Sequence, residues 1–92
     1  MSHLSKEKTK LIARIRRLKG QMDAVERALE AEAPCGEVLN LVASVRGAVN
    51  GLTMELIEDH LREHVCDPHT EPDAGRAQGT TELIDVLRRS LK

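Results

Sequence analysis

Residues 4–29 read LSKEKTKLIARIRRLKGQMDAVERAL, and this stretch decides the fold class. Its large apolar residues recur at steps of seven, three and four residues, which is typical of a long helix that packs against another helix. The members of this seam are Leu4, Leu11, Ile15, Leu18, Met22, Val25 and Leu29. The pattern predicts a first helix from about Ser5 to Glu30.

A second seam follows a break at Ala33 and Pro34. Pro34 lacks an N–H and suits the first turn of a new helix. The second seam consists of Val38, Val42, Val45, Val49, Leu52 and Leu56. We expect this helix to reach His64 or Cys66, since Pro68 cannot continue it.

The remaining residues predict a loop and a short helix. Residues 67–79 hold two Pro, two Gly and mixed charge, as loops do. Thr80 or Thr81 is expected to cap a third helix, whose apolar face is Leu83, Ile84, Leu87 and Leu91. Since no stretch shows the alternation of a strand, the chain is predicted to be an all-α, three-helix protomer.

The two long helices predict self-association. Each is about 40 Å long, and one hairpin with a short third helix cannot bury both seams. We expect two copies to form an antiparallel four-helix bundle about a two-fold axis. Gly47 and Gly51 would let a neighbouring backbone approach the second helix, although simple tolerance of glycine is the competing interpretation.

Composition narrows the classes of function. The 92 residues include no Phe, Tyr or Trp, so stacking platforms for single-stranded nucleic acid are excluded. Two cysteines are too few for a disulfide-stapled secreted scaffold, and no apolar run resembles a signal peptide or a membrane span. We expect a single cytoplasmic domain over residues 1–92, with reduced thiols and no membrane partner.

Charge is segregated along the chain. Residues 1–20 carry seven basic residues and one acidic residue, whereas residues 21–92 carry seven basic and fourteen acidic residues. On the first helix, a solvent-facing basic stripe is predicted within about 80° of azimuth, formed by Lys6, Lys10, Arg14 and Arg17. Such a stripe favours binding to a polyanion, with an ordinary solvated helix face as the alternative.

Four residues form a candidate metal site. His60 and His64 lie one turn apart, on one face of the second helix. Cys35 shares their azimuth but lies about 37 Å away along the same helix, so only an antiparallel copy can bring it close. Folding at residues 32–34 places His3 beside the histidine pair. The competing interpretations are a buried apolar cysteine, a frayed terminal histidine and a solvated histidine pair.

These residues resemble one protein family over nearly the whole chain. The N-terminal Met-Ser-His, the segment 14–21 (RIRRLKGQ), Cys35, the segment 45–52 (VRGAVNGL) and the segment 60–64 (HLREH) are similar to the CsoR/RcnR/FrmR family of bacterial transcriptional repressors. The resemblance implies helical dimers and flat tetramers that release operator DNA when an inducer binds. The DNA-binding residues it favours, together with the stripe, are Lys10, Arg14, Arg17, Lys19 and Arg46.

Within that family the ligand pattern distinguishes branches. Copper(I) members resemble a Cys-His-Cys set, and His64 replaces the second thiolate here, which disfavours a soft ion. The set His3, Cys35, His60 and His64 is similar to the nickel and cobalt branch. The resemblance therefore implies a repressor of metal efflux that Ni(II) or Co(II) induces, with Zn(II) as a further candidate.

The sequence fits three other classes of function less well. A formaldehyde-responsive repressor would use Cys35, but such members carry an N-terminal Pro amine where this chain has Ser2. This chain shows no oxyanion element, so we do not expect it to be an enzyme. A metal-binding or structural helical protein would leave the basic stripe unexplained. Cys66 and His69 could bind zinc with His64, against a solvated helix end as the alternative.

Overall fold

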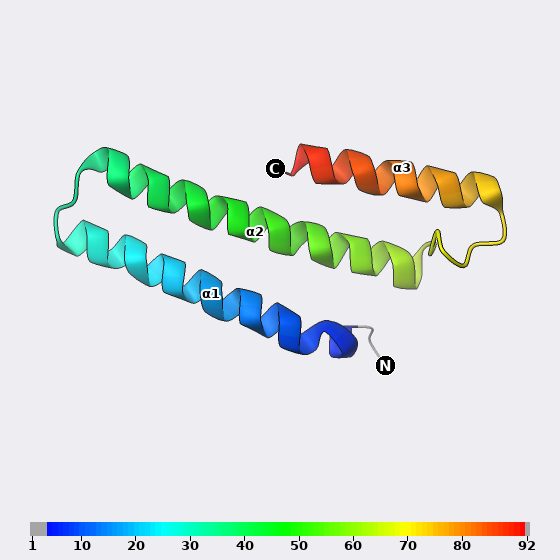
Figure 1. The fold of residues 1–92 in the computed structure, drawn as a ribbon, viewed down its shortest axis with the longest axis horizontal. Helices are drawn as coiled ribbons and strands as arrows, with labels where there is room; N and C mark the ends of the chain where they lie inside the picture. Colours follow the sequence, from blue (N-terminus) through cyan, green and yellow to red (C-terminus); the bar gives the residue numbers. More distant parts are fainter. Residues whose placement is uncertain (1–3, 92) are drawn as a thin grey trace.

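The computed structural model describes residues 4–91, with side chains over residues 8–91, and contains three helices. They are α1 (Leu4–Glu30), α2 (Cys35–His64) and α3 (Ala74–Ser90). Helices α1 and α2 form an antiparallel hairpin, and α3 folds back along the second half of α2 (Figure 1). No strand occurs over residues 4–91, so the all-α prediction and both long helices are confirmed. None of these helices is long and apolar enough to cross a membrane.

The turn between α1 and α2 is fixed by backbone hydrogen bonds. The N–H of Ala33 donates to the carbonyl of Ala28 at 2.9 Å, and the N–H of Glu32 donates to that of Leu29 at 3.1 Å. This Schellman pattern requires a left-handed residue, and Glu32 takes it with a φ of 56°. Pro34 then precedes the first residue of α2 as its N-cap. The predicted break is confirmed.

The prediction of a loop over residues 67–79, with a cap at Thr80 or Thr81, was wrong for its second half. Helix α3 begins at Ala74, and Asp73 caps it. The Asp73 carboxylate accepts the backbone N–H groups two and three residues later, at 2.9 and 3.3 Å. This cap satisfies donors that a helix start leaves free, which compensates for two glycines in the first turns.

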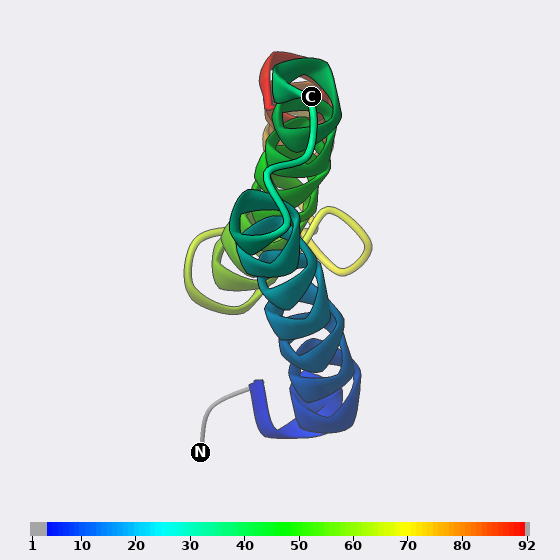
Figure 2. The same cartoon turned by 90° about the vertical axis from the view of Figure 1, so that its left-hand side faces the viewer.

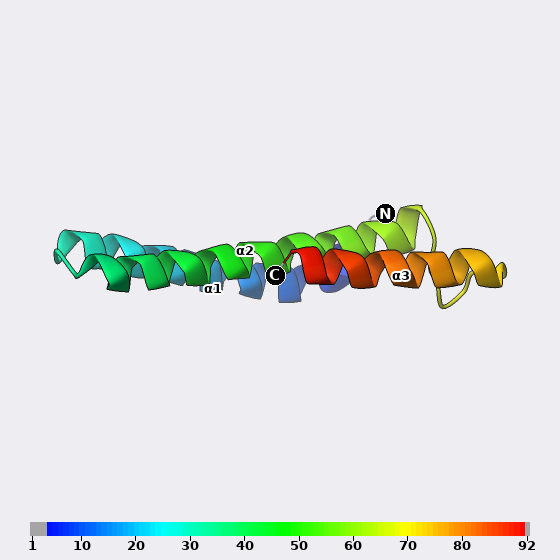
Figure 3. The ribbon, with the colours of Figure 1, turned by 90° about the horizontal axis from the view of Figure 1, so that it is seen from above.

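The protomer is elongated and thin. Its Cα atoms span 57 × 27 × 12 Å, with a radius of gyration of 17.4 Å, whereas a compact chain of this length would have about 12 Å. Figures 2 and 3 show that the helices form one flat layer. Over the described part of the chain, no large side chain is fully buried. The protomer alone therefore lacks a closed core.

Each apolar seam is covered along only one of its two rows. Alternate members are half-buried: Leu11, Leu18, Val25, Val38, Val45 and Leu52. The other members whose side chains the structure describes are exposed: Ile15 (37%), Met22 (52%), Leu29 (61%), Val42 (47%), Val49 (41%) and Leu56 (37%). The hairpin buries one row of each helix and leaves a second row open to solvent.

Candidate metal centre and nucleic-acid interface

The histidine pair lies near the carboxyl end of α2. The ring centroids of His60 and His64 are 4.9 Å apart, and the rings are tilted by 42°. Both residues are exposed. The i, i+4 spacing of the sequence thus brings two imidazoles to one accessible side of the helix, as a shared ion requires.

Of the remaining predicted ligands, Cys35 is not beside this pair within the chain. Cys35 is exposed as the first residue of α2, about 37 Å from His60 at 1.5 Å per residue. His3 lies outside the described residues. Among the side chains of residues 8–91, no three of His, Cys, Asp or Glu gather closely enough to hold one ion. Among the predicted ligands that the structure describes, His60 and His64 are the two that it brings together.

Cys66 is a structural residue in this chain. It is 7% exposed, and its Sγ lies 3.9 Å from Glu71 Oε2 and from the carbonyl oxygen of Arg76. The alternative interpretation, in which Cys66 belongs to a solvated helix end, was therefore wrong. A local zinc group with His64 and His69 is also absent from the part of the chain that the structure describes.

The basic stripe is only partly free in solvent. Lys10 Nζ lies 3.2 Å from Glu55 Oε1, and Arg14 Nε lies 2.9 Å from Glu55 Oε2. Arg14 is half-buried, so the expectation that the whole stripe faces solvent was wrong for this residue. The other predicted DNA-binding residues within the described side chains are exposed: Arg17, Lys19 and Arg46. Lys6 is not among the residues 8–91 whose side chains the structure describes.

Within this chain, Gly51 makes room for a side chain of α1. A Cβ atom built on Gly51 would lie 3.2 Å from Nη1 of Arg14, whereas one on Gly47 would meet nothing within 4 Å. The prediction that both glycines admit a neighbouring backbone concerns the bundle of two copies, and it stays a prediction. What Gly51 admits is the guanidinium of Arg14, one turn before Glu55.

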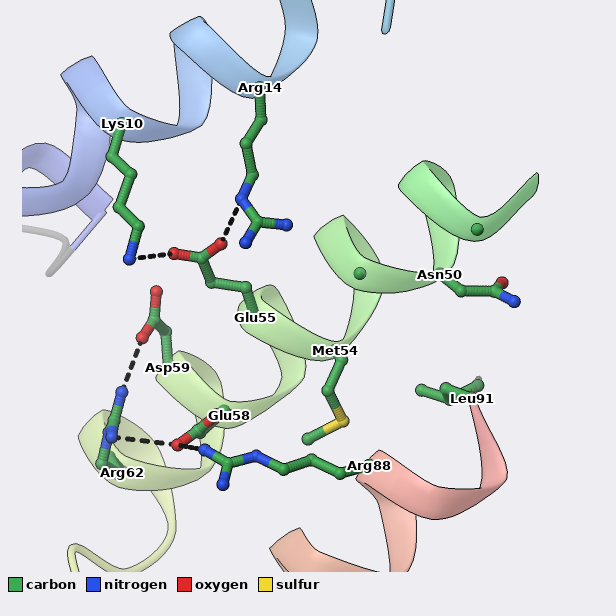
Figure 4. A pocket seen from close by; sticks show the side chains of 12 residues that line it. Lys10, Arg14, Asn50, Met54, Glu55, Glu58, Asp59, Arg62, Arg88 and Leu91 are labelled. Carbon is green, nitrogen blue, oxygen red and sulfur yellow. Dashed lines mark hydrogen bonds and ion pairs between the residues drawn. The ribbon is translucent and has the colours of Figure 1, made fainter. Parts of the chain in front are cut away.

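Acidic residues of α2 hold all three helices together, and the sequence interpretation missed them. Glu58 Oε1 accepts from Arg88 of α3 at 2.7 Å and from Arg62 at 3.2 Å, and Asp59 Oδ1 accepts from Arg62 at 3.0 Å (Figure 4). With Glu55 they line a cavity of about 670 Å³ between the helices. The hydrogen bond and the charge of Glu58 raise the pKa of Arg88. The i, i+3, i+4 spacing of Glu55, Glu58 and Asp59 places them on one face of α2, and this spacing could have identified the cluster from the sequence.

The chain is similar to characterised repressors over its full length. Residues 7–89 match the family described as "Metal-sensitive transcriptional repressor". The transcriptional repressor RcnR of Salmonella paratyphi B is 38% identical over all 92 residues, which cover the whole of both chains. An uncharacterized protein in the bioA 5' region of Serratia marcescens is 47% identical over the same complete span.

A solved structure has the same fold. A variant of the formaldehyde-responsive regulator FrmR from Salmonella enterica serovar Typhimurium superposes with a TM-score of 0.65 and 39% identity, covering 98% of this chain and 99% of that one. The family match also confirms that the chain is a regulator rather than an enzyme. Because the match spans residues 7–89, this chain belongs to the metal-sensitive transcriptional repressor family.

Proposed function

We propose that this chain is a cytoplasmic repressor that binds double-stranded operator DNA without metal and releases it on binding Ni(II) or Co(II), thereby controlling metal efflux. The observation that carries the proposal is the exposed, tilted pair of His60 and His64 in a chain of the metal-sensitive family. Residues 1–92 act together as one metal-sensing, DNA-binding domain. No separate module is needed, since helix α1 supplies the cations and α2 the imidazoles.

Self-association completes the site in this proposal. The exposed rows extend from Ile15 to Leu29 on α1 and from Val42 to Leu56 on α2, and burying apolar surface stabilises by about 25 cal/mol per Å². An antiparallel two-fold pairing of α2 with its copy brings the start of one helix against the end of the other. Cys35 of the partner subunit then lies beside His60 and His64. Two such dimers form the homotetramer that the family resemblance implies.

The donor set favours a borderline metal ion. The proposed ligands are His3, His60 and His64 of one subunit and Cys35 of the partner subunit. Imidazoles suit nickel, cobalt and zinc, while copper(I) prefers sulfur ligands. His60 and His64 are already close enough to share an ion. Three imidazoles and one thiolate therefore support Ni(II) or Co(II) as the inducer, with Zn(II) as a competitor.

The proposed DNA contacts lie mainly on α1. Lys10, Arg14, Arg17 and Lys19 project from this helix, and Arg46 projects from α2. Contacts between such side chains and phosphates dominate affinity and make it strongly dependent on salt. Sequence preference would then come from DNA shape and a few base contacts.

Formaldehyde is the second candidate inducer. Two observations favour it: the thiol of Cys35 is exposed, and a formaldehyde-responsive regulator shares the fold at 39% identity. This alternative needs a second nucleophile beside Cys35. The histidine pair would then have no part in sensing.

One titration tests these proposals. A fluorescent duplex, selected by the wild-type protein from a random library, is bound to the full chain and titrated separately with Ni(II), Co(II), Zn(II), Cu(I) and formaldehyde. Anisotropy reports release. We expect release by Ni(II) or Co(II) at the lowest concentrations. Release by formaldehyde alone would establish the alternative, and failure to select any duplex at low salt would contradict DNA binding itself.

A further inference from the structure

Glu55 of α2 is a shared counter-ion for two cations of α1. Lys10 and Arg14 both point to its carboxylate, one to each oxygen, at 3.2 and 2.9 Å (Figure 4). The Glu55 side chain is 16% exposed, whereas those of Lys10 and Arg14 are 63% and 37% exposed. The carboxylate is thus largely covered within the hairpin, whereas the two cations are more exposed.

These contacts are easily exchanged. Although Arg14 Nε lies 2.9 Å from Glu55 Oε2, its N–H does not point at that oxygen, which has no hydrogen-bond donor in the structure. Lys10 is mostly in solvent, and exposed ion pairs contribute little to stability. A phosphate, by contrast, can accept two parallel N–H groups of one guanidinium. Both cations can therefore leave Glu55 for a better acceptor.

Gly51 and Glu55 together position the side chain of Arg14 against α2. The missing Cβ of Gly51 leaves space for the guanidinium against α2, since a Cβ there would lie 3.2 Å from Nη1. Glu55 follows one turn later on the same face of the helix and supplies the negative charge. Space and charge thus coincide on α2 at the place where Arg14 lies.

We propose that Glu55 competes with operator phosphates for Lys10 and Arg14, and so lowers the operator affinity of the repressor. The inference rests on the proposed function, because it takes these two residues as DNA contacts. Each cation that binds a phosphate must first leave the Glu55 carboxylate. The remaining negative charge then lies within a Debye length of the phosphates and opposes their approach. Glu55 is a positioning residue that itself makes no contact with DNA.

The central test is the Glu55→Gln substitution in the full chain. Glutamine keeps the shape and removes the charge, so affinity for the selected duplex at low salt should rise about 2- to 10-fold. Glu58→Gln is the matched control, because Glu58 is an equally covered carboxylate of α2 that pairs with Arg62 and Arg88. We expect this control to give less than half of the gain. Glu55→Asp, which keeps the charge, should bind like the wild type.

A double-mutant cycle separates competition from a general charge effect. The gain from Glu55→Gln should vanish when Lys10→Gln and Arg14→Gln are already present. An equal gain in that background, or no gain in either, would overturn the competition. If Lys10→Gln and Arg14→Gln by themselves leave affinity unchanged, the proposed DNA surface is wrong instead.

A second variant covers the case in which Glu55→Gln does not fold. Gly51→Ala crowds the guanidinium while it improves helix propensity, so the chain should fold. Affinity should again rise, by less than with Glu55→Gln, and only while Arg14 is present. A gain that persists in the Arg14→Gln background would contradict the claim that Gly51 and Glu55 position Arg14.

Discussion

In the first half of α2, from Cys35 to Asn50, no side chain is buried, whereas the second half, from Gly51 to His64, contains two buried side chains, Met54 and Asp59. The first half lies beside α1 and exposes three large aliphatic side chains: Leu39, Val42 and Val49. The second half lies between α1 and α3 and is held to both by carboxylates.

The difference shows that one helix serves two purposes. The second half is stabilised by this chain's own helices and carries the histidine pair together with the counter-ion of the basic residues. The first half exposes an apolar row and the thiol of Cys35, and no residue that the structure describes covers them. We infer that a second copy packs on the first half, and the following predictions test that contrast.

The largest effect is expected from Val42→Glu. A carboxylate in an apolar contact loses its hydration without a partner, which costs several kcal/mol. The association constant should fall by more than about 100-fold, and DNA binding with it. Sedimentation velocity measures the change. Asn40→Glu adds the same charge to an exposed polar position of this half and should leave assembly intact. A Val42→Glu protein of wild-type mass in solution would show that this row is not an interface.

Cys35→Ala is expected to abolish metal-driven release while leaving metal-free DNA binding nearly unchanged. Allosteric coupling is typically 5- to 150-fold in affinity, and this ratio should fall to about 1 because a thiolate ligand is lost. Operator affinity with and without saturating Ni(II) gives the ratio. Cys66→Ala is the matched control, since Cys66 is enclosed beside Glu71 and Arg76 and should not affect release. Undiminished release from Cys35→Ala would exclude the shared site.

Arg14→Ala and Arg17→Ala should both weaken operator binding with little change in metal affinity. Each lost phosphate contact should reduce the slope of log affinity against log salt by about 0.9. Arg17→Ala should lose more affinity, because Arg14 must first leave Glu55. Fluorescence anisotropy over a range of salt measures both quantities. Arg27→Ala removes an exposed cation from the last turn of α1 and serves as the control. Wild-type binding by both variants would move the DNA surface elsewhere.

The smallest effect is expected from Arg88→Ala, which removes the link from α3 to the second half of α2. Arg88 donates to Glu58 at 2.7 Å, but its side chain is 54% exposed. The melting temperature should fall by less than about 5 °C, as for other exposed pairs. Circular dichroism measures it, with Arg89→Ala as the control. A much larger fall would mean that α3 is essential to the stability of the second half.

Local patterns predicted most of the fold. The seams of α1 and α2 and the break at Pro34 follow from residues close together in sequence, and all three are confirmed. The start of α3 was misplaced because Gly75 and Gly79 disfavour a helix by about 1 kcal/mol each, while Asp73 supplies a cap that offsets part of this cost. The i, i+4 histidine pair was predicted correctly because one helix alone defines it.

By itself the sequence determined which helices form, which candidate metal ligands are present and where positive charge is concentrated. Helix formation could be predicted because helical periodicity depends on spacing alone. The tertiary structure decided which row of each seam is covered, that Cys66 is enclosed, and that Glu55 meets Lys10 and Arg14. Spacing gives the azimuth of a residue on its own helix but not the rotation of that helix about its axis. That rotation is set by how the side chains of two helices pack against each other.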